Sequence, residues 1–147
     1  MYRKILVPMD GSGFSEISVK HAKALAIGCS AKEIILMGVV APIPDSAWVE
    51  PAERAEAAKR AEKWITGYLS NVAEGLKKDN IDAKAIIRKG DPASEILDYA
   101  KNNEDVDLII MATHGDSGIV RWLVGSVSER VVLHSTVPVM SIPPKSR

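Results

Sequence analysis

The residues best suited to chemistry form a glycine-rich stretch near the end of the chain. Ala112-Thr113-His114-Gly115-Asp116-Ser117-Gly118 is followed by Gly125-Ser126-Val127-Ser128-Glu129-Arg130. Glycine lets backbone approach a ligand closely, and the first turn of a helix has free N–H groups, so a glycine loop that opens into a helix suits phosphate oxygens. The hydroxyls of Ser126 and Ser128 add donors. The stretch therefore predicts a phosphate-binding loop.

The same stretch also has a purely structural interpretation. Gly115 and Gly118 can serve turns, and Ser126 with Glu129 three residues later matches a capping box at the start of a helix. A capped helix still presents free donors, so both interpretations can hold at once.

A second candidate is Asp10, a lone carboxylate directly after the first apolar run. It can hold a ribose hydroxyl or Mg²⁺, or it can shape the turn at Gly11. His114 could contact phosphate or act as a base, but no paired carboxylate or nucleophile is fixed beside it in the sequence. These residues favour binding over catalysis.

The elements that must position these groups are short apolar strands alternating with helices. The helix expected over 51–78 carries an apolar stripe that includes Trp64 and Tyr68 and should cover one face of a sheet. Strands are expected at 4–8, 33–40, 81–88, 106–112 and 137–142, and the other helices over a segment that ends at Gly28, over 93–101, and from near Ser126.

The resulting order, βαβαβαβαβ, predicts an α/β fold with a five-stranded parallel sheet and helices on both faces. Ligands of such sheets bind at the carboxyl ends of the strands. We expect that edge to hold Pro8-Met9-Asp10, Gly38-Val39-Val40 and the segment from Met111 to Gly115.

Composition narrows the class of protein. A chain of 147 residues with 46% hydrophobic and 26% charged residues predicts one domain over 1–147. Its 19 basic and 19 acidic residues cancel, so neither nucleic acid nor a membrane surface is an expected partner. A lone Cys29 and the lack of a long apolar run point to the cytoplasm.

The glycine stretch resembles the nucleotide-binding signature of the universal stress protein family, Gly-x2-Gly-x9-Gly-Ser/Thr. Gly115, nine intervening residues and Gly125-Ser126 match it, whereas Ala112 replaces its first glycine. The opening segment 5–12 and the closing Pro138-Val139-Met140 are also similar to that family. The resemblance implies a Rossmann-like fold of the adenine nucleotide alpha hydrolase type, with ATP or AMP as the ligand and Mg²⁺ as a candidate ion at Asp10.

The resemblance also implies roles for single residues. Asp10 would lie near the ribose or adenine, and Val39 would offer backbone groups to the adenine edge. Gly115, Gly125 and the two serines would surround the phosphates, and Ala112 would place a methyl group near the nucleotide. The full predicted site comprises Pro8, Met9, Asp10, Val39, Met111, Ala112, Gly115, Gly125, Ser126, Val127 and Ser128.

The favoured function is a stress-response regulatory module that binds an adenine nucleotide without significant turnover and signals to an unidentified protein partner. One alternative is a slow ATPase or nucleotide hydrolase, although the chain has no Gly-x4-Gly-Lys-Ser/Thr loop. The other is a dimeric interaction protein without a ligand. A homodimer is expected through Pro138 to Ile142, since an apolar last strand at a sheet edge invites pairing.

Overall fold

The protein, described here by a computed structural model over residues 2–43, 48–113 and 124–143, folds around one parallel sheet. Its strand order is β3-β2-β1-β4-β5, so β1 lies between β2 and β4 in the centre. The fold predicted from the sequence is confirmed. The strands are β1 (Lys4–Pro8), β2 (Glu33–Val40), β3 (Ala83–Lys89), β4 (Val106–Ala112) and β5 (Val139–Ile142).

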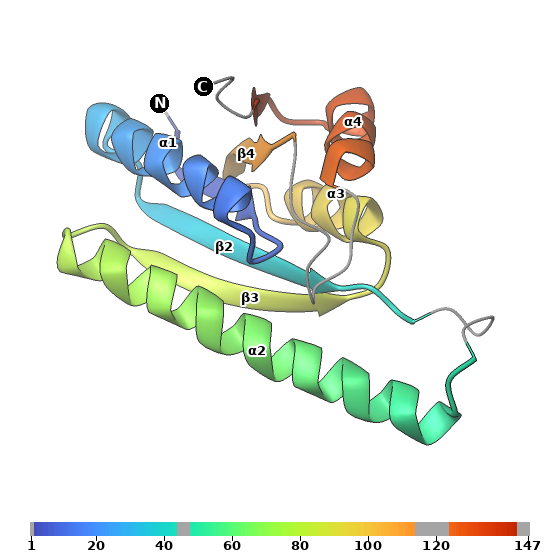
Figure 1. Ribbon diagram of the computed structural model, residues 1–147. Helices are drawn as coiled ribbons and strands as arrows, with labels where there is room; N and C mark the ends of the chain where they lie inside the picture. The colour runs from blue at the N-terminus through green and yellow to red at the C-terminus, as the bar shows by residue number, and fades with distance from the viewer. Residues whose placement is uncertain (1, 44–47, 114–123, 144–147) are drawn as a thin grey trace.

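Helices cover both faces of this sheet (Figure 1). The crossovers β1–β2 and β2–β3 run outward in one direction, whereas β3–β4 and β4–β5 run in the other. Because such crossovers are right-handed, the first two helices pack on one face and the last two on the opposite face. The helices are α1 (Gly13–Cys29), α2 (Pro51–Lys78), α3 (Pro92–Asn102) and α4 (Val124–His134).

The three inner strands supply most of the core. They are mainly continuous apolar runs, as expected for strands buried on both faces, whereas the edge strand β3 is only partly buried. The largest fully buried side chains are Ile5, Leu6, Met9, Ile34, Ile35, Leu36, Met37, Ile65, Leu69, Ile96, Ile109 and Ile110.

A glycine in β2 brings α2 close to the sheet. A Cβ atom at Gly38 would lie 2.8 Å from Cγ1 of Ile65 and 3.1 Å from Cδ1 of Leu69, so these side chains occupy the space that any other residue would need. The helix is therefore held next to the carboxyl end of β2, where the site is expected.

Local signals fix most element boundaries. Asp91 caps α3 through the N–H of Ser94, with Pro92 in its first turn, as the sequence predicted. The stop expected at Gly28 comes later, because α1 continues through Cys29 and ends where Ser30 adopts a left-handed backbone, with φ of 54°. No helix within the described ranges is both long and apolar enough to span a membrane.

Candidate functional site

The carboxyl ends of the central strands bring the predicted residues of the first half of the chain together. Pro8 pairs with Met37 of β2, and the N–H of Met9 donates to the carbonyl of Met37 at 2.8 Å. On the other side, Leu6 pairs with Ile109 of β4, and continuing that register by two residues brings Pro8 next to Met111. Pro8, Met9 and Met111 therefore line one buried edge.

Asp10 follows directly and is buried, with only 3% of its surface exposed. One carboxylate oxygen, Oδ1, accepts the N–H of Ser12 at 2.8 Å. The other, Oδ2, has no hydrogen-bond partner among the described residues. A buried polar atom left unpaired costs about 1–3 kcal/mol, and more when it is charged. Asp10 is thus placed to accept a hydrogen bond from a hydroxyl group or to bind a cation.

The turn that carries Asp10 has a defined shape. Gly11 has a positive φ of 83°, which an L side chain rarely adopts. Ser12 then caps α1, since its side chain accepts the N–H of Ser15 at 3.2 Å, and the Ser15 hydroxyl donates back to the Ser12 carbonyl at 2.8 Å. Local hydrogen bonds therefore set the internal shape of the Asp10 turn.

Val39 lies where β2 extends beyond the end of β1. β1 stops opposite Met37, so Gly38–Val40 continue beyond it. Successive residues of a strand direct their N–H and C=O groups alternately to either side. The carbonyl of Met37 faces β1 and that of Val40 faces Gly90 after β3. By this alternation the N–H and C=O of Val39 face the side where β1 has ended, next to the Asp10 turn.

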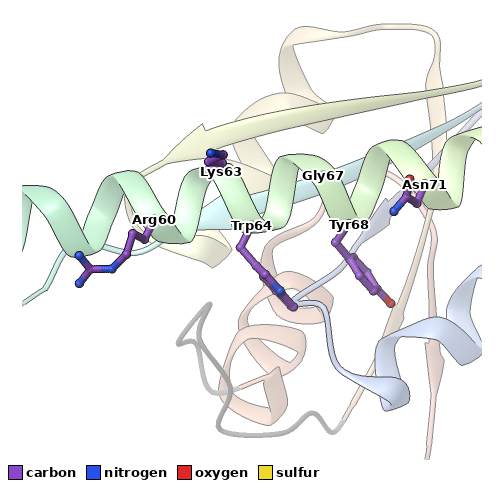
Figure 2. Close-up of a pocket in the computed structure, with 6 residues that line it drawn as sticks. All are labelled: Arg60, Lys63, Trp64, Gly67, Tyr68 and Asn71. Carbon is purple, nitrogen blue, oxygen red and sulfur yellow. The ribbon is translucent and has the colours of Figure 1, made fainter.

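Two aromatic residues of α2 complete this side of the site, and the sequence did not predict their role. A Cβ atom at Gly11 would lie 2.3 Å from Cη2 of Trp64, so the indole ring lies directly on the turn. Tyr68 stacks on Trp64 with ring centroids 5.5 Å apart. Figure 2 shows both rings on α2, beside an open groove. That groove is lined by Arg60, Lys63, Trp64, Gly67, Tyr68 and Asn71.

Tyr68 also connects α2 to α1. Its hydroxyl donates to Oε1 of Glu16 at 2.5 Å. Burial, this hydrogen bond and the negative charges of Glu16 and Asp10 raise the pKa of Tyr68 well above its ordinary value. The phenol therefore stays protonated and keeps its donor at all physiological pH values.

The second half of the predicted site lies on β4 and α4. Met111 and Ala112 are buried at the end of β4, and the N–H of Thr113 donates to the carbonyl of Ile142 at 3.0 Å. Gly115 and His114 lie outside the described residues. Gly125 belongs to the first turn of α4, Val127 and Ser128 are buried, and Ser126 is exposed.

The capping role predicted for Ser126 is wrong. The helix begins at Val124, so Ser126 is its third residue, whereas an N-cap stands outside the helical backbone. The correction alters which groups are free: in a helix that runs from Val124, the N–H groups of residues 124–126 precede the first intrahelical bond. Gly125 and Ser126 thus remain candidate donors to an anion through their backbone.

A charge pair ties α4 to the adjacent turn. Nη1 of Arg130 lies 3.0 Å from Oδ2 and 3.2 Å from Oδ1 of Asp91, the cap of α3. Hydrogen bonds from the Ser94 hydroxyl and N–H, with the nearby Arg130 charge, lower the pKa of Asp91 below its ordinary value. Sequence spacing indicated the cap, but nothing in it pointed to the contact between positions 91 and 130.

Among the described residues, the side chains that could build a metal centre are those of His, Cys, Asp and Glu. Over the described ranges, no three His, Cys, Asp or Glu side chains gather in a way that could hold a metal ion. The prediction of Mg²⁺ at Asp10 therefore rests on that single candidate ligand.

Comparison with known proteins agrees with this architecture over nearly the whole chain. A universal stress protein from Methanothermobacter thermautotrophicus is 38% identical over 136 residues, which covers 90% of this chain and 89% of that protein. The solved structure of universal stress protein UspA from Lactobacillus plantarum superposes with a TM-score of 0.81 at 28% identity, covering 96% of this chain and 97% of that one.

Two more distant structures share the fold and are complexes. One is a universal stress protein with cAMP, at TM-score 0.69 and 24% identity, covering 96% of this chain and 97% of that one. The other is a family member from Arabidopsis thaliana with AMP bound, at TM-score 0.69 and 18% identity, covering 98% and 93%. The family model of the universal stress proteins matches residues 1–143, and the chain belongs to the universal stress protein family.

Proposed function

We propose that this protein is a cytoplasmic regulatory module of the stress response that binds an adenine nucleotide, ATP or AMP, at the carboxyl edge of its sheet. The observation that carries the proposal is the buried Oδ2 of Asp10, which has no partner among the described residues and lies beside the end of β2. The cAMP and AMP found in the two distant relatives support the choice of an adenine nucleotide.

Each part of the ligand has a matching group. Adenine carries an amino donor beside a ring-nitrogen acceptor, and the N–H and C=O of Val39 offer the complementary pair. A ribose hydroxyl supplies the donor that Asp10 lacks. Anionic phosphate suits the free N–H groups at the start of α4 and the hydroxyl of Ser126. Mg²⁺ carried by the nucleotide is the alternative ligand that we propose for the same Asp10 oxygen.

Calorimetry tests the proposal directly. We expect ATP with Mg²⁺ to bind in the micromolar range, roughly −8 kcal/mol, and Asp10→Ala to weaken binding on the order of tenfold or more. Asp82→Ala is the matched control. That exposed carboxylate directly precedes β3, so it lies at the amino ends of the strands, away from the site. No heat with millimolar ATP, ADP or AMP would show that the site is not a nucleotide site.

We expect binding rather than turnover. The loop of a P-loop ATPase, with its phosphate lysine, is missing from the sequence, and Asp10 is committed through Oδ1 to the turn. Steady-state hydrolysis should therefore stay below about one per minute, against typical enzyme rates of about ten per second. Rapid phosphate release that disappears in His114→Ala would instead support the hydrolase alternative.

We also propose a homodimer through β5, supported by the contrast between the two edges of the sheet. β3 exposes the charged side chains of Lys84, Arg88 and Lys89, which discourage pairing. β5 carries no charge, and α4 beside it leaves Val132 and Leu133 50% and 69% exposed. An apolar edge of this kind is suited to a twofold partner.

Light scattering tests the dimer. Val139→Lys combined with Ile142→Lys is expected to give a monomer, and Lys84→Ala with Arg88→Ala at the opposite edge should leave the dimer intact. A parent protein that is already monomeric at high concentration contradicts this part of the proposal.

A further inference from the structure

We propose that Trp64 is a positioning residue of the nucleotide site, which acts by holding the β1–α1 turn so that Asp10 keeps its unpaired oxygen directed to the ligand. The inference rests on the proposed function and adds a residue from α2, an element that the glycine signature does not include. Three observations on the described residues carry it.

The first observation is the contact itself. The indole ring fills the space next to Gly11 so completely that even a methyl group there would come within 2.3 Å of Cη2 and 2.5 Å of Cζ3. Gly11 directly follows Asp10, and its positive φ is the conformation that turns the chain into α1. A ring packed on that residue restricts the backbone next to the carboxylate.

The second observation is that the ring is itself held. Tyr68 stacks on it with an angle of 14° between the ring planes, and the Tyr68 hydroxyl is bound to Glu16 in the first turn of α1. Ile65, the next residue along α2, lies against Gly38 of β2. The helix backbone at Trp64 is therefore held next to β2 through Ile65, and the ring is held near the start of α1 through Tyr68.

The third observation is that the turn needs such a restraint. Asp10 is 3% exposed and its Oδ2 has no partner among the described residues, so the turn gains hydration if it swings outward. The Ser12–Asp10 bond lies within the turn and moves with it, and the Ser12–Ser15 bonds hold only the later end of the turn, where α1 begins. Trp64 contacts the turn from α2, a different element. Its side chain is 39% exposed, so burial in the core does not by itself account for its position.

The test separates the two halves of the ligand. Adenosine probes the Asp10 side, and inorganic tripolyphosphate probes the α4 side. Trp64→Ala is expected to weaken adenosine binding on the order of tenfold and to leave tripolyphosphate binding within about twofold, because a preorganised turn is lost while α4 is untouched. Trp64→Phe, which keeps a ring on Gly11, should restore most of the adenosine affinity. Trp48→Ala is the control, since that tryptophan is fully exposed.

A double-mutant cycle tests whether Trp64 acts through Asp10. Trp64→Ala should add little to the loss caused by Asp10→Ala, because both remove the same interaction. Additive losses, or equal losses for adenosine and tripolyphosphate, would overturn the inference. If Trp64→Ala does not fold, Trp64→Leu replaces it with the same expectations.

The outcomes also separate this inference from the proposed function. If the parent binds none of the nucleotides, the function proposal fails first. If the parent binds and Asp10→Ala weakens binding while Trp64→Ala does not, the site stands and the role of Trp64 is wrong.

Discussion

The two sides of the candidate site are built in different ways. On the Asp10 side, a turn is fixed by packing: Trp64 lies on Gly11 and Tyr68 binds Glu16. On the α4 side, the glycine signature identifies the residues, Val127 and Val131 anchor the helix in the core, and the tie to the neighbouring turn is the exposed pair of Arg130 and Asp91. Changes on the Asp10 side should therefore damage the fold together with binding, whereas changes on the α4 side should damage binding alone.

The largest effect is expected for Gly11→Ala. The new methyl group meets the Trp64 ring and the residue must keep a positive φ, so the free energy of unfolding should fall by about 2–4 kcal/mol. Urea denaturation measures it. Gly13→Ala is the control two residues on, because a Cβ atom there meets nothing within 4 Å. Equal losses in the two variants would mean that Trp64 does not restrain the turn.

Gly125→Val is expected to lower the affinity for ATP and to leave the free energy of unfolding nearly unchanged, in contrast to Gly11→Ala. A branched side chain in the first turn of α4 should weaken ATP binding on the order of tenfold or more, while the free energy of unfolding stays within about 1 kcal/mol of the parent. Calorimetry and thermal melts give the two values. Gly28→Val, near the end of α1 in open space, should leave the affinity unchanged. ATP binding as tight as in the parent would remove Gly125 from the site.

Asp91→Asn tests the tie on the α4 side and should cost about 1 kcal/mol or less, because Asn still caps α3 and the pair with Arg130 is exposed. The pKa of Asp91 is lowered in the folded state, so its contribution is present above the ordinary value of 3.8 and disappears as pH falls through the lower folded pKa. Unfolding curves from pH 7 to 2 should therefore converge for parent and variant. A difference that persists at pH 2 contradicts this origin.

Tyr68→Phe should have the smallest effect at neutral pH, below about 1 kcal/mol, because Glu16 can bind water instead. In alkali this small advantage of the parent shrinks and then reverses. The raised pKa of Tyr68 means that the unfolded chain releases its proton above pH 10 while the folded protein retains it, so the parent loses stability as pH rises. Melts between pH 9 and 11 should show a shallower decline for the variant, and parallel declines would contradict the assignment.

The sequence predicted the fold closely because its signals were local. Continuous apolar runs marked β1, β2 and β4, and Asp91-Pro92 marked the start of α3. The start of α4 was predicted two residues late because a serine followed by Glu129 imitates a cap. A single sequence gives no direct information on which backbone residues already adopt helical angles.

The site was only partly predictable for the same reason. Asp10 and Val39 follow from the strand ends and the family resemblance, and the structure places them at one edge. Trp64 was assigned to an apolar stripe because its contact with Gly11 joins residues more than fifty positions apart. Long-range contacts of this kind leave no periodic signal in the sequence.

The central place of β1 sets an order of assembly. The first strand obtains its neighbour β2 from the next element of the chain, but its other neighbour is β4, and the Arg3 N–H that binds Asp107 bridges 104 positions. A chain emerging from the ribosome can build β1, β2, β3, α1 and α2 first, and pairing with β4 is the slow, non-local step. Until then one edge of β1 has no strand paired with it. The Asp10 turn with its tryptophan is therefore expected to form before β4 completes the sheet.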